Sequence, residues 1–102
     1  MMHNYQIVIE YDGLNFVGWQ FQKNGISIQE TIEKTLKKIL KENIRIIGAG
    51  RTDKGVHAIG QCANFFAKKK IENKEKFIVS VNFFLRKKFI SIIDIKKKKI
   101  RF

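Results

Sequence analysis

The sequence has no proline, one cysteine and no apolar run long enough to cross a membrane. A single cysteine, Cys62, cannot form an internal disulfide, which fits a reducing compartment. The longest apolar run, Phe77 to Leu85, is interrupted by two polar residues, whereas a spanning helix needs about 20 apolar residues. No basic segment followed by an apolar stretch opens the chain, so no signal peptide is predicted. These absences predict a cytoplasmic protein that does not associate with membranes.

Acidic residues are also scarce, since 9 Asp and Glu stand against 21 Lys and Arg, for a net charge of +12. Residues 1–60 carry 8 basic and 6 acidic side chains, whereas residues 61–102 carry 13 and 3. Such a charge favours a polyanionic partner, with nucleic acid the first candidate and an anionic membrane the second. A general bias toward Lys, Ile, Asn and Phe would explain the same numbers without any partner.

The N-terminal part of the chain predicts a strand, a turn and a helix. Apolar and polar residues alternate from Tyr5 to Tyr11, which indicates a strand with one buried face. Ser27 and Glu30 have the spacing of a helix capping box, and apolar residues follow at helical spacing as far as Leu40. Two acid–lysine pairs at a spacing of four residues would stabilise this helix: Glu30 with Lys34, and Glu33 with Lys37.

The rest of the chain predicts strands at about 44–49 and 57–66, a helix at 74–85 and a strand at 89–95. This order, β-α-β-β-α-β, indicates an α+β, ferredoxin-like fold with an antiparallel sheet and both helices on one face. The opposite face would meet solvent, a ligand, a second domain or a partner chain, and RNA-binding domains of this topology bind RNA there. The residues that could leave apolar surface on it are Phe65, Phe66, Phe89, Ile92 and Ile93.

Two stretches, residues 11–22 and 48–61, are richer in glycine, aromatic and polar residues than a core requires. In the second, Gly50 and Gly55 bracket Asp53, and Arg51 lies two positions before it. In an extended segment, Arg51 and Asp53 would project the same way and could pair. Such a pair would keep the carboxylate ionised and oriented, as a nucleophile requires. An aspartate in a glycine-rich turn is, however, most often a turn former.

Other chemistries fit the sequence less well. The third glycine of a dinucleotide fingerprint is misplaced after Gly48-Ala49-Gly50, and no phosphate-binding Gly-Lys-Ser/Thr occurs. The two histidines and the cysteine lack zinc-ligand spacing, so no metal site is predicted. A glycosidase needs two carboxylates, which Asp12 and Asp53 could supply only if the two glycine-rich stretches meet.

Taken together and in this order, the two stretches resemble the N-terminal half of the bacterial tRNA pseudouridine synthase A family. The residues that match its first motif are Tyr11, Asp12, Gly13, Phe16, Gly18, Trp19, Gln20 and Gln22. The residues that match its catalytic motif are Gly50, Arg51, Thr52, Asp53, Gly55, Val56, His57, Ala58, Gly60 and Gln61. Weaker similarity runs from Asn82 to Ile95, so the resemblance covers essentially the whole chain.

The resemblance implies an enzyme that isomerises uridine to pseudouridine at positions 38–40 of the tRNA anticodon stem-loop, with no metal or organic cofactor. Asp53 would be the nucleophile, acting at the ribose C1′ or C2′ or at the uracil C6. Arg51 would pair with Asp53 and fill the space that the extracted uridine leaves. The RNA-facing rim would include Lys54, His57 and Gln20. The residues that would support the site structurally are Tyr11, Asp12, Gly13, Phe16, Trp19, Gly50 and Gly55.

Two departures from the family pattern concern the end of the chain. Family members continue into a second half that supplies a tyrosine against the target uracil and a basic residue that pairs with the nucleophile, and the proline usual after the second helix is missing near Arg86. Residues 1–102 are therefore expected to be the N-terminal catalytic half-domain of an enzyme whose full-length members form homodimers. The competing hypotheses are a non-catalytic RNA-binding module and, third, the two-carboxylate glycosidase.

Overall fold

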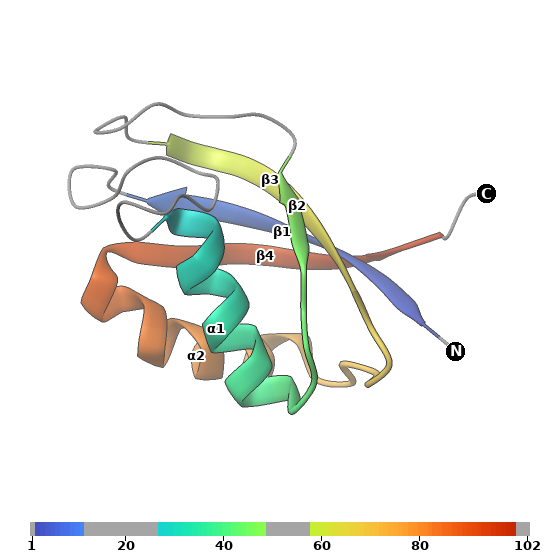
Figure 1. Cartoon of the computed structure of the whole chain (residues 1–102). Helices are drawn as coiled ribbons and strands as arrows, with labels where there is room; N and C mark the ends of the chain where they lie inside the picture. The colour runs from blue at the N-terminus through green and yellow to red at the C-terminus, as the bar shows by residue number, and fades with distance from the viewer. Residues whose placement is uncertain (1, 12–26, 49–57, 100–102) are drawn as a thin grey trace.

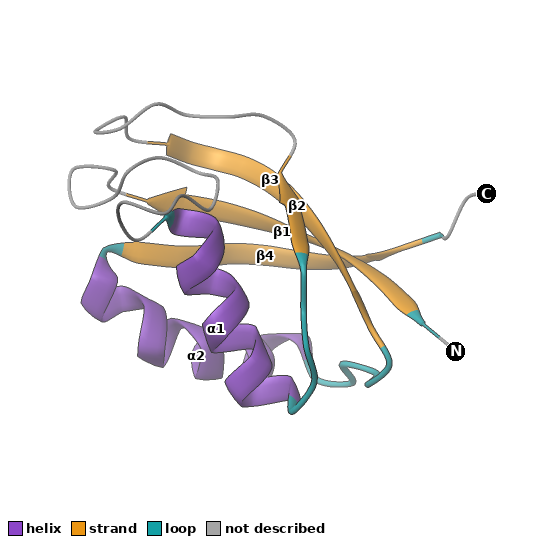
Figure 2. Cartoon of the chain, viewed as in Figure 1, coloured by secondary structure: helices purple, strands orange, loops and turns teal. Residues whose placement is uncertain are grey.

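The computed structural model describes residues 2–11, 27–48 and 58–99. These residues form a four-stranded antiparallel sheet with two helices on one face (Figure 1). The elements in chain order are β1 (His3–Tyr11), α1 (Ile28–Leu40), β2 (Ile46–Gly48), β3 (Ala58–Ala67), α2 (Lys74–Leu85), the 3₁₀ turn η2 (Arg86–Lys88) and β4 (Ile90–Lys98). The strands lie in the order β2-β3-β1-β4, and Figure 2 shows both helices on the same side. The predicted α+β, ferredoxin-like fold is confirmed.

The core lies between the sheet and the helix layer. β1 is central and pairs with both β3 and β4, so its inward side chains, including Ile7 and Ile9, are fully buried. Each helix contributes its apolar stripe to the same core because residues three and four apart share one helix face. The helix residues buried there are Ile28, Ile32, Leu36 and Leu40 from α1, and Phe77, Val81 and Leu85 from α2.

The predicted start of α1 is confirmed by its hydrogen bonds. Ser27 has extended backbone geometry, and its hydroxyl accepts a hydrogen bond from the Glu30 N–H at 3.0 Å. The Glu30 carboxylate lies 3.2 Å from the Lys34 ammonium, as the spacing of four predicts. The predicted pair of Glu33 with Lys37 is wrong, because the Glu33 carboxylate instead accepts the backbone N–H of Ile46 at 2.9 Å.

The start of β4 differs from the prediction because the chain reverses there. Phe89, predicted to begin the strand, has φ 62°, donates its N–H to the Arg86 carbonyl and is 59% exposed. This left-handed residue ends η2 and turns the chain, so β4 begins at Ile90. At its other end β4 runs on to Lys98, because the three lysines after Ile95 pair with β1.

A bulge in β4 changes which of its residues face the core. Val8 of β1 lies opposite Asp94 while the next residue, Ile9, lies opposite Ile92, so Ile93 is the extra residue. The buried side chains therefore shift from Ile90 and Ile92 before the bulge to Ile95 after it. A strict alternation of inward and outward residues, as the sequence predicts it, does not include this change in which residues face the core.

The open face of the sheet carries apolar and basic side chains together. Of the residues proposed for it, Phe66 and Ile93 are 38% and 49% exposed, whereas Phe65 and Ile92 are buried under the helices. Ile47 of β2 is exposed as well. Lys96 and Lys98 lie opposite Gln6 and Asn4 of β1. Part of the predicted open apolar surface is therefore present.

On each edge strand of the sheet, helix side chains bind the backbone groups of one residue. On β2, the Ile46 N–H donates to Glu33 and the Ile46 carbonyl accepts from the Gln29 side chain, both residues of α1. On β4, the Asn82 side chain of α2 bonds both backbone groups of Ile92, accepting from its N–H at 2.7 Å and donating to its carbonyl at 3.0 Å. Each helix thus satisfies backbone groups that could otherwise pair with another strand.

Candidate functional site

The residues predicted to be catalytic, to bind RNA or to support the site lie almost entirely outside the described part of the chain. Tyr11 is the one that the structure describes. The others, which stay predictions, are Asp12, Gly13, Phe16, Trp19, Gln20, Gly50, Arg51, Asp53, Lys54, Gly55 and His57. What the structure provides is the frame to which both motif stretches are attached.

That frame brings one end of each motif stretch to the same place in the sheet. Tyr11, the last residue of β1, lies directly opposite Ala58, the first residue of β3, and also opposite Ile90 of β4. Tyr11 immediately precedes the first stretch of undescribed residues, and Ala58 immediately follows the second. Tyr11 and Ala58 are 47 positions apart in the sequence, and through them the two stretches are anchored on neighbouring strands.

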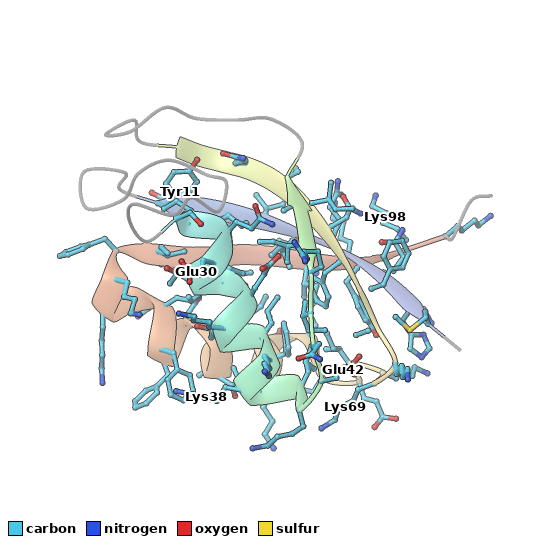
Figure 3. All side chains as sticks on the ribbon, in the orientation of Figure 1. Tyr11, Glu30, Lys38, Glu42, Lys69 and Lys98 are labelled. Atoms are coloured by element: carbon cyan, nitrogen blue, oxygen red, sulfur yellow. The ribbon has the colours of Figure 1, made fainter. Side chains whose placement is uncertain are left out.

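A hydrogen bond fixes this end of the sheet. Tyr11 is only 3% exposed, and its phenol O–H donates to the Gln61 side-chain carbonyl of β3 at 2.6 Å. Figure 3 shows the Tyr11 side chain at this end of β1. A bond of this length between two side chains on paired strands restricts how the strand ends can move.

Gln61 matches the catalytic motif, but the sequence does not predict it as a site residue. It lies opposite Ile9, which is fully buried, so the pairing puts a polar side chain at an inward position of β3. A polar residue at an inward strand position needs a hydrogen-bond partner, and Tyr11 provides one. The alternation of inward and outward positions along β3, which puts Gln61 on the inward side, is the signal that could have identified it from the sequence.

The electrostatics of the described residues are dominated by lysine. Asp94 on β4 pairs with Lys74 at the start of α2, 2.6 Å away, and this hydrogen bond with a further bond to the Ile95 backbone lowers the pKa of the Asp94 carboxyl. In the described ranges no group of three or more His, Cys, Asp or Glu side chains is placed to hold a metal ion. No helix within those ranges is long and apolar enough to span a membrane.

Comparisons with known proteins point to one family over this part of the chain. A family model described as tRNA pseudouridine synthase matches residues 7–100. A relative from Pelagibacter ubique, named tRNA pseudouridine synthase A, is 52% identical over 101 residues, which cover 99% of this chain and 41% of the relative. Relatives of the same name from Ehrlichia ruminantium and Caldicellulosiruptor saccharolyticus are 46% and 49% identical, over 91% and 79% of this chain and 38% and 33% of their own length.

The chain therefore spans less than half the length of these relatives. The family match begins within β1 and takes in every later helix and strand, together with the two motif stretches that are anchored at Tyr11 and Ala58. Because one family model accounts for nearly all of the sequence and close relatives carry the same name, the chain belongs to the tRNA pseudouridine synthase family.

Proposed function

We propose that this chain carries the catalytic motif for isomerising uridine to pseudouridine at positions 38–40 of the tRNA anticodon stem-loop. The observation that carries the proposal is the family match over residues 7–100, which includes Asp53 in its Gly-Arg-Thr-Asp context. The pairing of Tyr11 with Ala58 supports it, because that pairing anchors the two motif stretches on adjacent strands.

The proposed chemistry needs a nucleophile and an extracted base. Overall, the C1′–N1 bond of uridine is replaced by a C1′–C5 bond, N1 gains a proton and C5 loses one. Asp53 would form the transient covalent bond, at the ribose C1′ or C2′ or at the uracil C6, and would be released when the new bond is complete. Arg51 would hold the Asp53 carboxylate ionised and occupy the space of the flipped uridine. The rim residues would be Lys54, His57 and Gln20.

The proposal is tested by tritium release from tRNA that carries [5-³H]uridine, because isomerisation expels the C5 hydrogen. The assay is run with the chain itself and with the chain joined to the part of the Pelagibacter ubique relative that lies beyond the match. Tritium release by either protein supports the proposal. Free uracil without tritium release would indicate a glycosidase, and tRNA binding without either product would indicate the non-catalytic RNA-binding module. The predicted homodimer is checked on the same samples by sedimentation.

The open sheet face favours the RNA-binding module as a second candidate. Across its strands it displays Ile47 on β2, Phe66 on β3, and Ile93, Lys96 and Lys98 on β4. Aromatic side chains beside basic ones suit single-stranded RNA, whose bases stack while its phosphates pair with lysine. This surface is compatible with both functions, so the product assay decides between them.

Tyr11 is expected to act as a positioning residue. Tyr11→Phe removes the phenol O–H that binds Gln61 and should cost about 1 kcal/mol of stability. It should also lower kcat for isomerisation about tenfold with little change in KM, because a loosened strand end misplaces the attached motif stretches. Measurements of kcat, KM and thermal unfolding check both effects.

Tyr5→Phe is the matched control at the other end of the sheet. The Tyr5 hydroxyl accepts a hydrogen bond from the Ile71 N–H at 2.8 Å, so its loss should cost similar stability. It should leave kcat unchanged, because Tyr5 lies at the end of β1 away from both motif stretches. Equal losses of kcat in the two variants would show that Tyr11 contributes stability alone.

A further inference from the structure

The solvent side of α1 is composed of lysine. All the exposed side chains of this helix are lysines, namely Lys34, Lys37 and Lys38, and the residue that ends it, Lys41, is exposed as well. They line a shallow groove together with Glu42 and Asn43. The helix rises about 1.5 Å per residue, so these four ammonium groups are spread along roughly 10 Å of one surface.

Among the described residues, Lys34 is the only one of these four lysines that forms an ion pair with a carboxylate. Glu30 pairs with Lys34, and Glu33 is bound to the Ile46 N–H. Glu42 accepts the backbone N–H groups of Lys68 and Lys69, at 2.9 and 3.1 Å. In the described part of the chain, neither Glu33 nor Glu42 forms an ion pair with Lys37, Lys38 or Lys41.

Aromatic contacts extend the basic surface from α1 to the end of α2. The Lys38 ammonium lies 4.6 Å from the centre of the Phe84 ring, Phe84 packs edge-on against Phe83, and the Lys87 ammonium lies 5.2 Å from the Phe83 ring. Cation–π contacts hold the two ammonium groups over the helix layer and leave their charge in place. Figure 3 shows Lys38 and Lys69 on the side of the molecule away from Tyr11.

We infer that this helix-layer basic surface, formed by Lys34, Lys37, Lys38, Lys41 and Lys87, binds the phosphate backbone of the tRNA body, apart from the catalytic site. The inference rests on the proposed function for the identity of the RNA. A duplex presents one phosphate charge per about 1.7 Å of its axis, so a row of lysines 10 Å long meets several phosphates at once. Lysine suits such contacts because it acts as a point charge without requiring fixed geometry.

The lysines of α1 lack the exposed apolar face that a helix in a membrane interface needs, although Phe83 of α2 is 64% exposed. A helix that lies in a lipid interface buries an apolar face among the lipids beside its basic face. The apolar face of α1 is already used, because Ile28, Ile32 and Leu36 are fully buried in the protein core. Its lysines therefore face a hydrated partner.

The test measures binding of fluorescent, unmodified tRNA transcript by anisotropy between about 50 and 200 mM salt. In the triple variant Lys37→Gln, Lys38→Gln, Lys41→Gln, the Lys34–Glu30 pair remains and helix propensity is kept. We expect at least a tenfold loss of affinity near 150 mM salt. The slope of log K against log salt should fall by about 2 to 3, since each lost phosphate contact removes about 0.9.

The matched control removes the same charge from the end of β4, with Lys97→Gln, Lys98→Gln and Lys99→Gln. An equal or greater loss of tRNA affinity in this control than in the α1 triple variant would overturn the inference, because net charge or the sheet face would then explain binding. A loss of binding to phosphatidylserine vesicles by the α1 variant with tRNA binding unchanged would also overturn it. A cooperative thermal unfolding transition in both variants, with a midpoint close to that of the parent chain, excludes misfolding as the cause.

The outcome is separable from that of the proposed function. The α1 variant should raise KM for isomerisation and leave kcat at saturating tRNA unchanged, since these lysines do not contact the reacting base. Absence of isomerisation in every protein would refute the proposed function, yet the anisotropy comparison would still decide whether α1 binds RNA.

Discussion

Asp53→Asn is expected to abolish tritium release from [5-³H]uridine tRNA, with a fall of at least ~10³-fold in rate. The substitution keeps the shape of the side chain but removes the negative charge with which a carboxylate attacks carbon. Affinity for tRNA should change by less than about threefold, because lysines supply the attraction to phosphate and keep their charge. The measurements are single-turnover tritium release and tRNA anisotropy on the same preparation, made with whichever form of the protein, alone or joined to the relative's second part, shows activity.

A matched control separates loss of the nucleophile from loss of an acidic residue. Glu75→Gln removes one carboxylate from the exposed first turn of α2, away from both motif stretches, and should leave the rate unchanged. A covalent adduct trapped by 5-fluorouridine tRNA should form with the parent chain and fail to form with Asp53→Asn. Release of tritium by Asp53→Asn at the parental rate would refute the assignment of the nucleophile and leave the RNA-binding module as the better account.

The fold was predictable because its elements have clear periodicity and local stop signals. The alternation from Tyr5 to Tyr11 appears as β1, and Ser27 caps α1 as its spacing with Glu30 predicts. α2 has the predicted bounds, and Asn73 caps it by accepting the Lys76 N–H. Such features are encoded within a few residues, so sequence alone carries them.

The features that sequence missed depend on contacts between distant residues. The bulge at Ile93 is defined by the pairing of β4 with β1, and the left-handed Phe89 by the turn that η2 makes before β4. Glu33 was predicted to pair along its own helix, but the edge of β2 competes for its carboxylate. An amide N–H at a sheet edge needs an acceptor more than an exposed lysine needs an ion pair.

For the candidate site, the sequence supplies the residues and the structure supplies the strands to which they are attached. The motif residues, Asp53 above all, come from the resemblance of the sequence to a family, and they lie outside the described residues. The structure contributes the anchors, in the pairing of Tyr11 with Ala58 and the bond from Tyr11 to Gln61. Spacing within each stretch is a local property, whereas the adjacency of the two stretches is a property of the sheet.

Asn82→Leu is expected to be the most destabilising of the substitutions considered, at about 2 to 5 kcal/mol. Asn82 is 7% exposed, and its amide satisfies both the N–H and the carbonyl of Ile92. Leucine has a similar volume but no polar atoms, so two buried backbone groups would lose their partners, each at about 1 to 3 kcal/mol. A domain of this kind has about 5 to 15 kcal/mol of stability, so a large share would be lost.

Urea and thermal unfolding measure the loss, which should lower Tm by roughly 10 to 30 °C in a domain of this size. Asn73→Ala is the matched control, since it removes an asparagine of the same helix that makes one exposed capping bond to Lys76 and should cost about 1 kcal/mol. Hydrogen exchange localises the effect, because the Ile92 N–H should lose protection in Asn82→Leu and keep it in Asn73→Ala. If the two variants unfolded at the same urea concentration, the closure of the β4 edge by Asn82 would contribute little to stability. α2 would then hold the sheet through Phe77, Val81 and Leu85 alone.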